Sequence, residues 1–179
     1  MRRLVTMICA GAAMALAATS ASAEVVEQRD DGFTLRFEAP LTGELDHAWA
    51  TVGRIGEWWE DSHTYSGDAS NLTLDLSPGG CWCETLPGET PGAVKHGEAV
   101  LIWPGRTARF FAALGPLQAT APSAVLTMTW PEGEDGARKI VWTYVVEGRG
   151  MGQLATVVDG VIGTQFRNYA ALANAPANG

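Results

Sequence analysis

The sequence predicts an α+β domain in which a curved antiparallel sheet of about six or seven strands packs against one long C-terminal helix, with two short helices after the first strand. Apolar and polar side chains alternate in several short stretches, which is typical of half-buried strands. Glycine and proline separate these stretches at short intervals, as tight turns require. After Gly150 apolar residues recur every three or four positions, the period of an amphipathic helix.

The first strand is predicted at residues 33–37, where aromatic and aliphatic residues alternate with polar ones. The two short helices, residues 46–52 and 54–59, are each too brief to be stable without packing. The later strands are expected, in order, at residues 72–76, 81–86, 94–103, 107–112, 124–130 and 139–147.

The final helix is predicted over about 20 residues, a length of about 30 Å. Its apolar stripe consists of Leu154, Val158, Val161, Gln165 and Tyr169. Such a helix would bury its stripe against the concave face of the sheet. A pocket remains wherever the helix and the sheet do not meet.

Residues 1–23 have the features of a secretory signal. Arg2 and Arg3 precede an apolar stretch that is too short for a good membrane span, and Ala21-Ser22-Ala23 matches a small-x-small cleavage site. We therefore expect cleavage near Ala23, a single domain at residues 24–173, a frayed tail at 174–179, and a periplasmic or secreted protein.

The charge of the chain excludes some partners. The full chain carries −8, and loss of the two signal arginines leaves −8 − 2 = −10. An acidic surface disfavours nucleic acids and anionic membranes, and no second apolar stretch is long enough to span a bilayer. No glycine-rich phosphate loop opens a helix, so we expect no nucleotide and no other cofactor.

Cys81 and Cys83 flank Trp82 after a Gly-Gly break. On a strand they share one face, while Trp82 and Glu84 share the other. Residues two apart on an extended strand lie about 6.5–7 Å apart, the upper limit for a disulfide, so a bridge would need a bulge or a twist. Three interpretations stay open: packed free thiols, a strained disulfide, and a metal site that also uses His63 and His96.

Glu84, His63 and His96 are the candidate acid–base residues. If Trp82 faces the interior, Glu84 does too, and a buried carboxylate must pair or become neutral. Either state suits proton transfer to a bound molecule. The alternatives are a Glu84 that reaches solvent at the strand end and histidines that bond to loop backbone.

A set of mainly aromatic and apolar residues is predicted to face the interior or the mouth of a cavity, and would bind a small apolar molecule. The alternative for each aromatic residue is that it simply fills the core. The set comprises Trp59, Tyr65, Trp82, Trp103, Phe110, Gln118, Trp130, Trp142, Val158 and Ile162.

The element order resembles the START/Bet v1-like (SRPBCC) superfamily of helix-grip domains, and within it the AHSA1-like branch, which includes polyketide cyclase-like proteins. The resemblance covers about residues 33–172 and rests on Trp58-Trp59, Pro78-Gly79-Gly80, residues 97–103 with Pro104-Gly105, and the final helix. Residues 63–67, 81–84 and 115–118 look like motifs of an exported bacterial subgroup. The resemblance implies a hydrophobic cavity under the helix, but no particular reaction.

Three functions are therefore expected, in this order. The first is an exported carrier or sensor of a small hydrophobic ligand. The second is a cyclase- or dehydratase-type enzyme that uses Glu84, His63 and His96. The third is a structural or stress-related module with a filled core and no small ligand.

Overall fold

The computed structural model describes residues 22–121 and 123–176. The expected signal segment lies almost entirely outside the described residues. In the part that is described, no helix is both long enough and apolar enough to span a bilayer.

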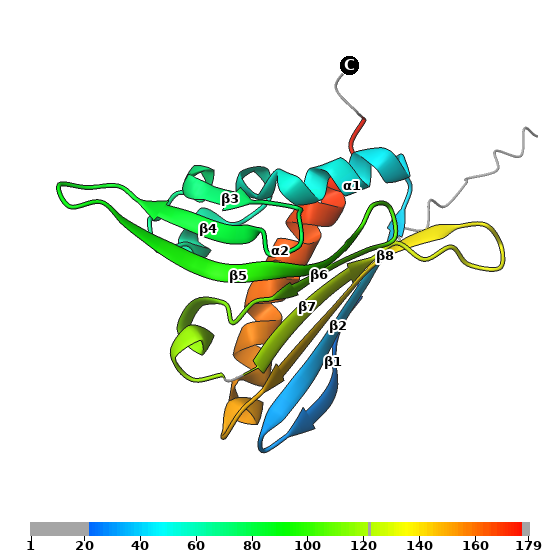
Figure 1. The fold of residues 1–179 in the computed structure, drawn as a ribbon. Helices are drawn as coiled ribbons and strands as arrows, with labels where there is room; N and C mark the ends of the chain where they lie inside the picture. Colours follow the sequence, from blue (N-terminus) through cyan, green and yellow to red (C-terminus); the bar gives the residue numbers. More distant parts are fainter. Residues whose placement is uncertain (1–21, 122, 177–179) are drawn as a thin grey trace, which may run out of the picture.

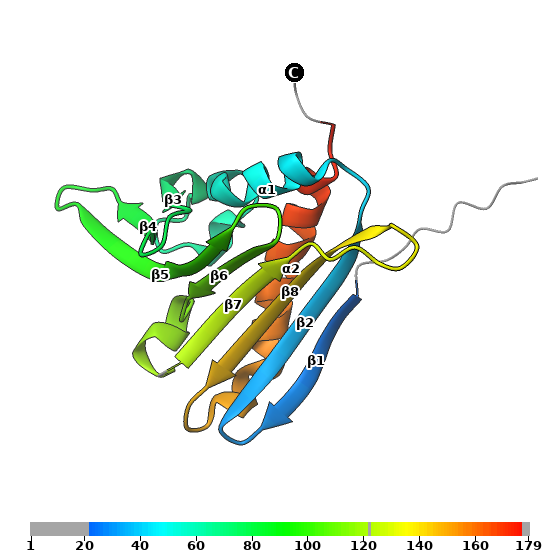
Figure 2. The same ribbon diagram turned by 45° about the vertical axis from the view of Figure 1, so that its right-hand side comes forward.

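Eight strands form one antiparallel sheet with the spatial order β1-β2-β8-β7-β6-β5-β4-β3 (Figures 1 and 2). Every neighbouring pair in this order is antiparallel. The strands are β1 (Ser22–Arg29), β2 (Gly32–Leu41), β3 (Leu72–Leu74), β4 (Cys81–Leu86), β5 (Gly92–Trp103), β6 (Thr107–Phe111), β7 (Ser123–Thr129) and β8 (Arg138–Glu147).

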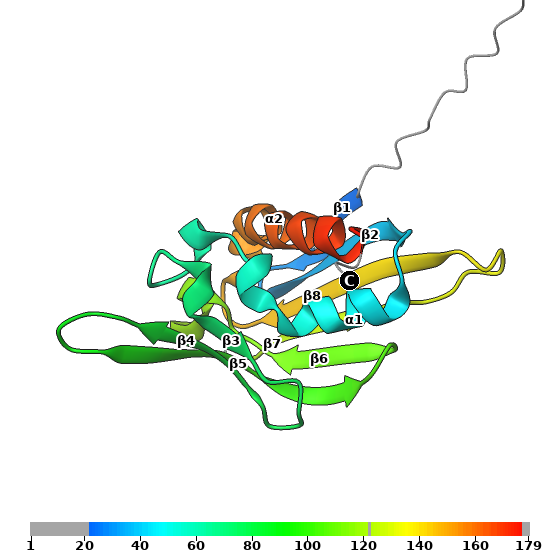
Figure 3. The same cartoon turned by 90° about the horizontal axis from the view of Figure 1, so that it is seen from above.

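The long helix α2 (Ala155–Ala173) lies across one face of the sheet, and α1 (Leu45–Gly53) runs past its C-terminal end (Figure 3). Single 3₁₀ turns connect the other elements. They are η1 (Ile55–Glu57), η2 (Asp61–His63), η3 (Ala69–Asn71), η4 (Gly115–Ala119) and η5 (Met151–Leu154). The predicted α+β layout, with one final helix against an antiparallel sheet, is confirmed.

Four details differ from the sequence prediction. The first predicted strand, residues 33–37, is longer and spans Gly32–Leu41 as β2. The sheet has eight strands because β1 precedes the first predicted strand and forms a hairpin with β2. Its residues do not alternate strictly, and a register shift between Val25 and Glu27 interrupts the pairing. The second short helix is only the 3₁₀ turn η1, because Arg54 leaves the helical conformation at φ −89° and ψ 46°. Leu76 lies beyond the end of β3.

The C-terminal end of α2 is tied down at Asn174, which we had expected to begin a frayed tail. The Asn174 side-chain oxygen accepts hydrogen bonds from the backbone amides of Thr42 and Gly43, at 2.7 and 3.0 Å. Its amide donates to the Pro40 carbonyl at 3.1 Å. Residues 177–179 lie outside the described residues.

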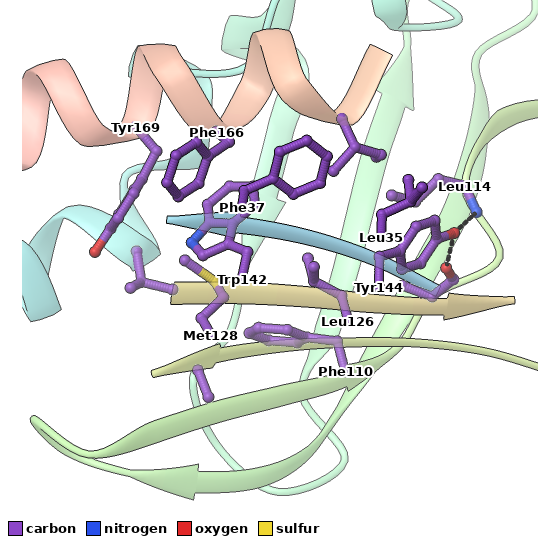
Figure 4. Close-up of a cluster of buried hydrophobic side chains, with 14 of the residues drawn as sticks. Leu35, Phe37, Phe110, Leu114, Leu126, Met128, Trp142, Tyr144, Phe166 and Tyr169 are labelled. Atoms are coloured by element: carbon purple, nitrogen blue, oxygen red, sulfur yellow. Dashed lines mark hydrogen bonds between the residues drawn. The ribbon is translucent and has the colours of Figure 1, made fainter. Parts of the chain in front are cut away.

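Aromatic side chains fill most of the space between α2 and the sheet (Figure 4). Phe166 packs on Phe37 and Trp142, each with ring centroids 5.5 Å apart. The Tyr169 hydroxyl donates to the Ala48 carbonyl at 2.7 Å and accepts from the Trp130 indole at 3.2 Å. Aromatic rings and a buried hydroxyl thus pack closely beneath the C-terminal half of the helix.

Candidate ligand-binding pocket

Strand β4 presents Trp82 and Glu84 to the interior, and each is 1% exposed. Cys81 and Cys83 lie half-buried on the opposite face and are joined as a disulfide, with their Cα atoms 5.4 Å apart. This separation is shorter than in an extended strand, as a bridge between these positions requires. The β4–β5 register also shifts beside the bridge, where β5 carries the extra residue His96 between the partners of Trp82 and Cys83. The cysteines are thus placed on the face away from the core.

Glu84 is buried, not exposed at the strand end, because it fastens a surface loop to the sheet. Its carboxylate accepts hydrogen bonds from the backbone amides of Tyr65 and Ser66, at 3.2 and 2.5 Å. It also contacts His96 Nε2 at 2.7 Å, from the neighbouring strand β5. We call residues 60–66 the 60–66 loop.

Burial alone would raise the pKa of Glu84, but the hydrogen bonds from Ser66, Tyr65 and His96 outweigh it, and the pKa is lowered. Glu84 is therefore ionised at neutral pH. An ionised carboxylate only accepts hydrogen bonds, so His96 donates from Nε2. With three donors on one carboxylate, Glu84 is well suited to hold the loop and less suited to exchange protons with a ligand.

A second buried polar residue, Gln165 on α2, holds the other half of the 60–66 loop. It is fully buried. Its side-chain oxygen accepts from the backbone amide of Glu60 at 2.8 Å, and its Nε2 lies 2.7 Å from His63 Nδ1. The His63 carbonyl in turn accepts from the Trp59 indole at 3.0 Å. The loop is therefore anchored to both the sheet and the long helix.

The helix-end pocket, with a volume of about 400 Å³, lies between the start of α2, the 60–66 loop and η4. Aliphatic side chains from α2 and η4 form most of its wall, and no lining residue carries a formal charge at neutral pH with His63 neutral. The lining comprises Trp59, Ser62, His63, Thr64, Tyr65, Leu114, Gly115, Pro116, Leu117, Leu154, Val157, Val158, Val161 and Ile162.

Four of the residues predicted to bind a ligand line this pocket: Trp59, Tyr65, Val158 and Ile162. Four others, Trp82, Phe110, Trp130 and Trp142, do not, because they are at most 2% exposed and fill the core. Their inward orientation is as expected, but neighbouring aromatic rings occupy the space that a ligand would need.

The remaining two predicted residues lie elsewhere. Trp103 is 55% exposed at the end of β5, where the Arg106 guanidinium sits 4.8 Å from its ring centroid. Gln118 donates to the Lys95 carbonyl at 3.1 Å and lines a second cavity of about 500 Å³. His96 and Phe111 border this second cavity as well.

The candidate acid–base residues do not form one site. Glu84 and His96 are paired, while His63 is bonded to Gln165 and lines the helix-end pocket, which neither Glu84 nor His96 lines. Within residues 22–121 and 123–176, no three His, Cys, Asp or Glu side chains gather to hold a metal ion. The hypothetical metal site of Cys81, Cys83, His63 and His96 is therefore not formed.

Several residues that line or support the pocket were not predicted as site residues. Gln165 supports it from behind, through the 60–66 loop, and is the most informative, because a polar residue inside an apolar helical stripe signals a buried hydrogen-bond partner. Val157 and Leu117 gave no such signal. Their role depends on how η4 folds back against α2, which no local pattern reveals.

Comparison with solved structures places this fold among known ones. CalU16 from Micromonospora echinospora aligns with 87% of each chain at a TM-score of 0.56 and 12% identity. The alignment with Ms6760 from Mycobacterium smegmatis covers 87% of this chain and 98% of Ms6760, with a TM-score of 0.52 and 17% identity. The di-domain ARO/CYC protein StfQ, from the steffimycin biosynthetic pathway, aligns with a TM-score of 0.57 and 11% identity.

The match to StfQ covers 82% of this chain and 52% of StfQ, so this chain spans about half of that protein. No protein-family model matches the sequence, and a search of curated proteins finds no relative. Identities this low establish the fold alone. The shared fold, one long helix against an antiparallel sheet, is consistent with the expected helix-grip architecture.

Proposed function

We propose that this protein binds a small, mainly apolar molecule in the helix-end pocket and acts as a carrier or sensor. The observation that carries the proposal is the pocket itself, a volume of about 400 Å³ with an aliphatic and aromatic lining. Val157 on α2 and Tyr65 on the 60–66 loop are 67% and 55% exposed there. Apolar side chains exposed at a concave site are typical of ligand-binding pockets.

Two further assignments belong to the proposal. We place the chain in the AHSA1-like, polyketide cyclase-like branch of the superfamily, within an exported bacterial subgroup. This is supported by the sequence motifs and by the fold shared with an ARO/CYC protein. We also propose a periplasmic or secreted location, on the basis of the signal-like residues 1–23.

Filling the pocket should weaken binding. Val158 is half-buried and lines the pocket, so Val158→Trp would place a large ring in the space that a ligand needs. We expect the affinity for the neutral fluorescent probe N-phenyl-1-naphthylamine to fall at least about tenfold. Fluorescence titration measures the affinity, and native mass spectrometry of the wild-type protein tests for a co-purified ligand.

Ala171→Trp is the matched control, because Ala171 is exposed on the same helix and does not line the pocket. It should bind the probe like the wild type, and circular dichroism should show that both variants are folded. Failure of the wild-type protein to bind the probe or to carry any ligand would refute the proposed function. Equal affinity in Val158→Trp and the wild type would place binding elsewhere.

A further inference from the structure

The hydrogen-bonding role of the His63 imidazole, in the lining of the helix-end pocket, is fixed by the protein. Its role follows from Gln165. The Glu60 backbone amide can only donate, so the Gln165 atom 2.8 Å away must be the side-chain oxygen. A flipped amide would set two N–H groups against each other. The Gln165 amide orientation is thus determined by the backbone.

The amide orientation in turn determines the proton position on His63. Gln165 Nε2 can only donate, and it lies 2.7 Å from His63 Nδ1 and 3.3 Å from the Val161 carbonyl. His63 Nδ1 must therefore accept with its lone pair. In a neutral imidazole with unprotonated Nδ1, the hydrogen is on Nε2.

This Nε2–H group is free to bind a ligand. His63 is exposed and lines the pocket, and none of the described residues hydrogen-bonds to its Nε2. The hydroxyls of Ser62 and Tyr65 also line the pocket, but a hydroxyl can donate or accept, so neither selects for an acceptor on the ligand. Thr64 donates its hydroxyl to the Asp61 carbonyl at 2.7 Å.

We infer that His63 is a specificity-determining residue that donates a hydrogen bond from Nε2 to a neutral oxygen acceptor on the ligand, such as a ketone, ester or ether. The neutral character follows from the lining, which has no lysine or arginine to balance a ligand carboxylate or phosphate. Gln165 is a positioning residue that acts through His63. This inference rests on the proposed function, since it names the ligand class of the same pocket.

The test uses two probes with the same apolar body, 2-acetylnaphthalene and 2-ethylnaphthalene, of which only the first carries an acceptor oxygen. Each is titrated in competition with N-phenyl-1-naphthylamine. His63→Phe keeps a ring but removes both nitrogens. We expect the preference for the acetyl over the ethyl probe to be about 3- to 10-fold greater in the wild type than in His63→Phe, the range of one net hydrogen bond.

His47→Phe is the matched control, because His47 bonds to the Leu172 carbonyl at 3.1 Å and does not line the pocket. It should leave the preference unchanged. If the wild type binds neither N-phenyl-1-naphthylamine nor either naphthalene, the proposed function itself fails. If both probes bind and His63→Phe leaves the ratio of their affinities unaltered, the proposed binding pocket is supported and the inference about His63 is overturned.

A spectroscopic measurement tests the tautomer directly. The ¹⁵N signals of the His63 ring, assigned by their loss in His63→Phe, should show a protonated Nε2 and an unprotonated Nδ1 in the neutral ring. Gln165→Met should yield a mixture of tautomers and reduce the acetyl preference. A neutral wild-type ring with its proton on Nδ1 would contradict the assignment.

Discussion

Glu84 shows how one buried residue can organise a surface segment. Its carboxylate is 1% exposed, yet it bonds to two consecutive amides of the 60–66 loop and to a histidine on the next strand. Hydrogen bonds to a charged group are stronger than neutral ones, and they offset the cost of burying the charge. The loop that forms one wall of the helix-end pocket therefore depends on a residue outside the pocket.

Replacing Glu84 with glutamine should destabilise the protein. The amide has one acceptor oxygen where the carboxylate has two, so at least one loop amide or His96 loses its partner. We expect the free energy of unfolding at pH 7 to fall by about 2–3 kcal/mol, measured by urea denaturation. Glu98→Gln, at an exposed ion pair with Lys95, is the control and should change stability by less than about 1 kcal/mol.

The effect of Glu84→Gln should also depend on pH. The pKa of Glu84 in the folded protein is below the ordinary value of 4.5, so the unfolded chain binds the proton first as the pH falls. The stabilisation by this carboxylate is complete above about pH 4.5 and is lost as the pH falls through the folded-state pKa. The stability difference between wild type and variant should shrink below pH 4.5. A difference that stays constant down to acid unfolding would contradict this role.

The sequence predicted part of this residue-level arrangement. The predicted hairpin of β4 and β5 already placed His96 within reach of β4, although the register pairs Glu84 with Val94 and leaves His96 as the extra residue at the register shift. The partner of His63 was not predictable, because Gln165 lies 102 residues away. Nor did the sequence distinguish core tryptophans from pocket residues, since both occupy inward positions of the same pattern.

At the level of elements, β4, β5, β7, β8 and α2 lie within about two residues of their predicted positions. Their apolar patterns are strong because one face packs on the core. The misjudged elements, β1 and η1, have weak patterns and depend on their neighbours. Strand β1 is held by pairing with β2 and by the contact of Gln28 with the Gly152 carbonyl at 2.8 Å.

The junction between β1 and α2 depends on close backbone packing at Gly152. A methyl group there would lie 1.7 Å from the Arg29 carbonyl oxygen, so Gly152→Ala must push the two elements apart. We expect a loss of about 1–3 kcal/mol in the free energy of unfolding, measured by urea denaturation. Gly160→Ala is the matched control, because nothing lies within 4 Å of its added methyl group on the exposed side of α2.

Gly160→Ala should stabilise the protein by up to about 1 kcal/mol, since alanine has the higher helix propensity. The two alanine variants are therefore expected to change stability in opposite directions. A neutral Gly152→Ala would mean that η5 does not pack on β1 as described.

At the scale of the whole molecule, the disulfide and the proposed export together predict the mass of the mature protein. Bacterial periplasm is oxidising, so the Cys81–Cys83 bridge should form there. Protein recovered from the periplasm of a bacterial host should have the mass of residues 24–179 less two hydrogen atoms. Reduction should add those two hydrogens.

Intact-mass spectrometry separates the two parts of this prediction. A chain that retains residues 1–23 would contradict the cleavage. A mature chain whose mass is unchanged on reduction would contradict the bridge. Cytoplasmic expression without residues 1–23 is the control, and there the two thiols should be free.

The anchoring of the 60–66 loop also determines when, during its synthesis, the protein can first bind a ligand. The bonds of Gln165 to Glu60 and His63 join residues 105 and 102 positions apart in the chain. Helix α2 leaves the ribosome or the export channel after all the other described elements. Until it docks, the pocket lacks one wall and His63 has no fixed tautomer, so ligand capture must follow the synthesis of α2.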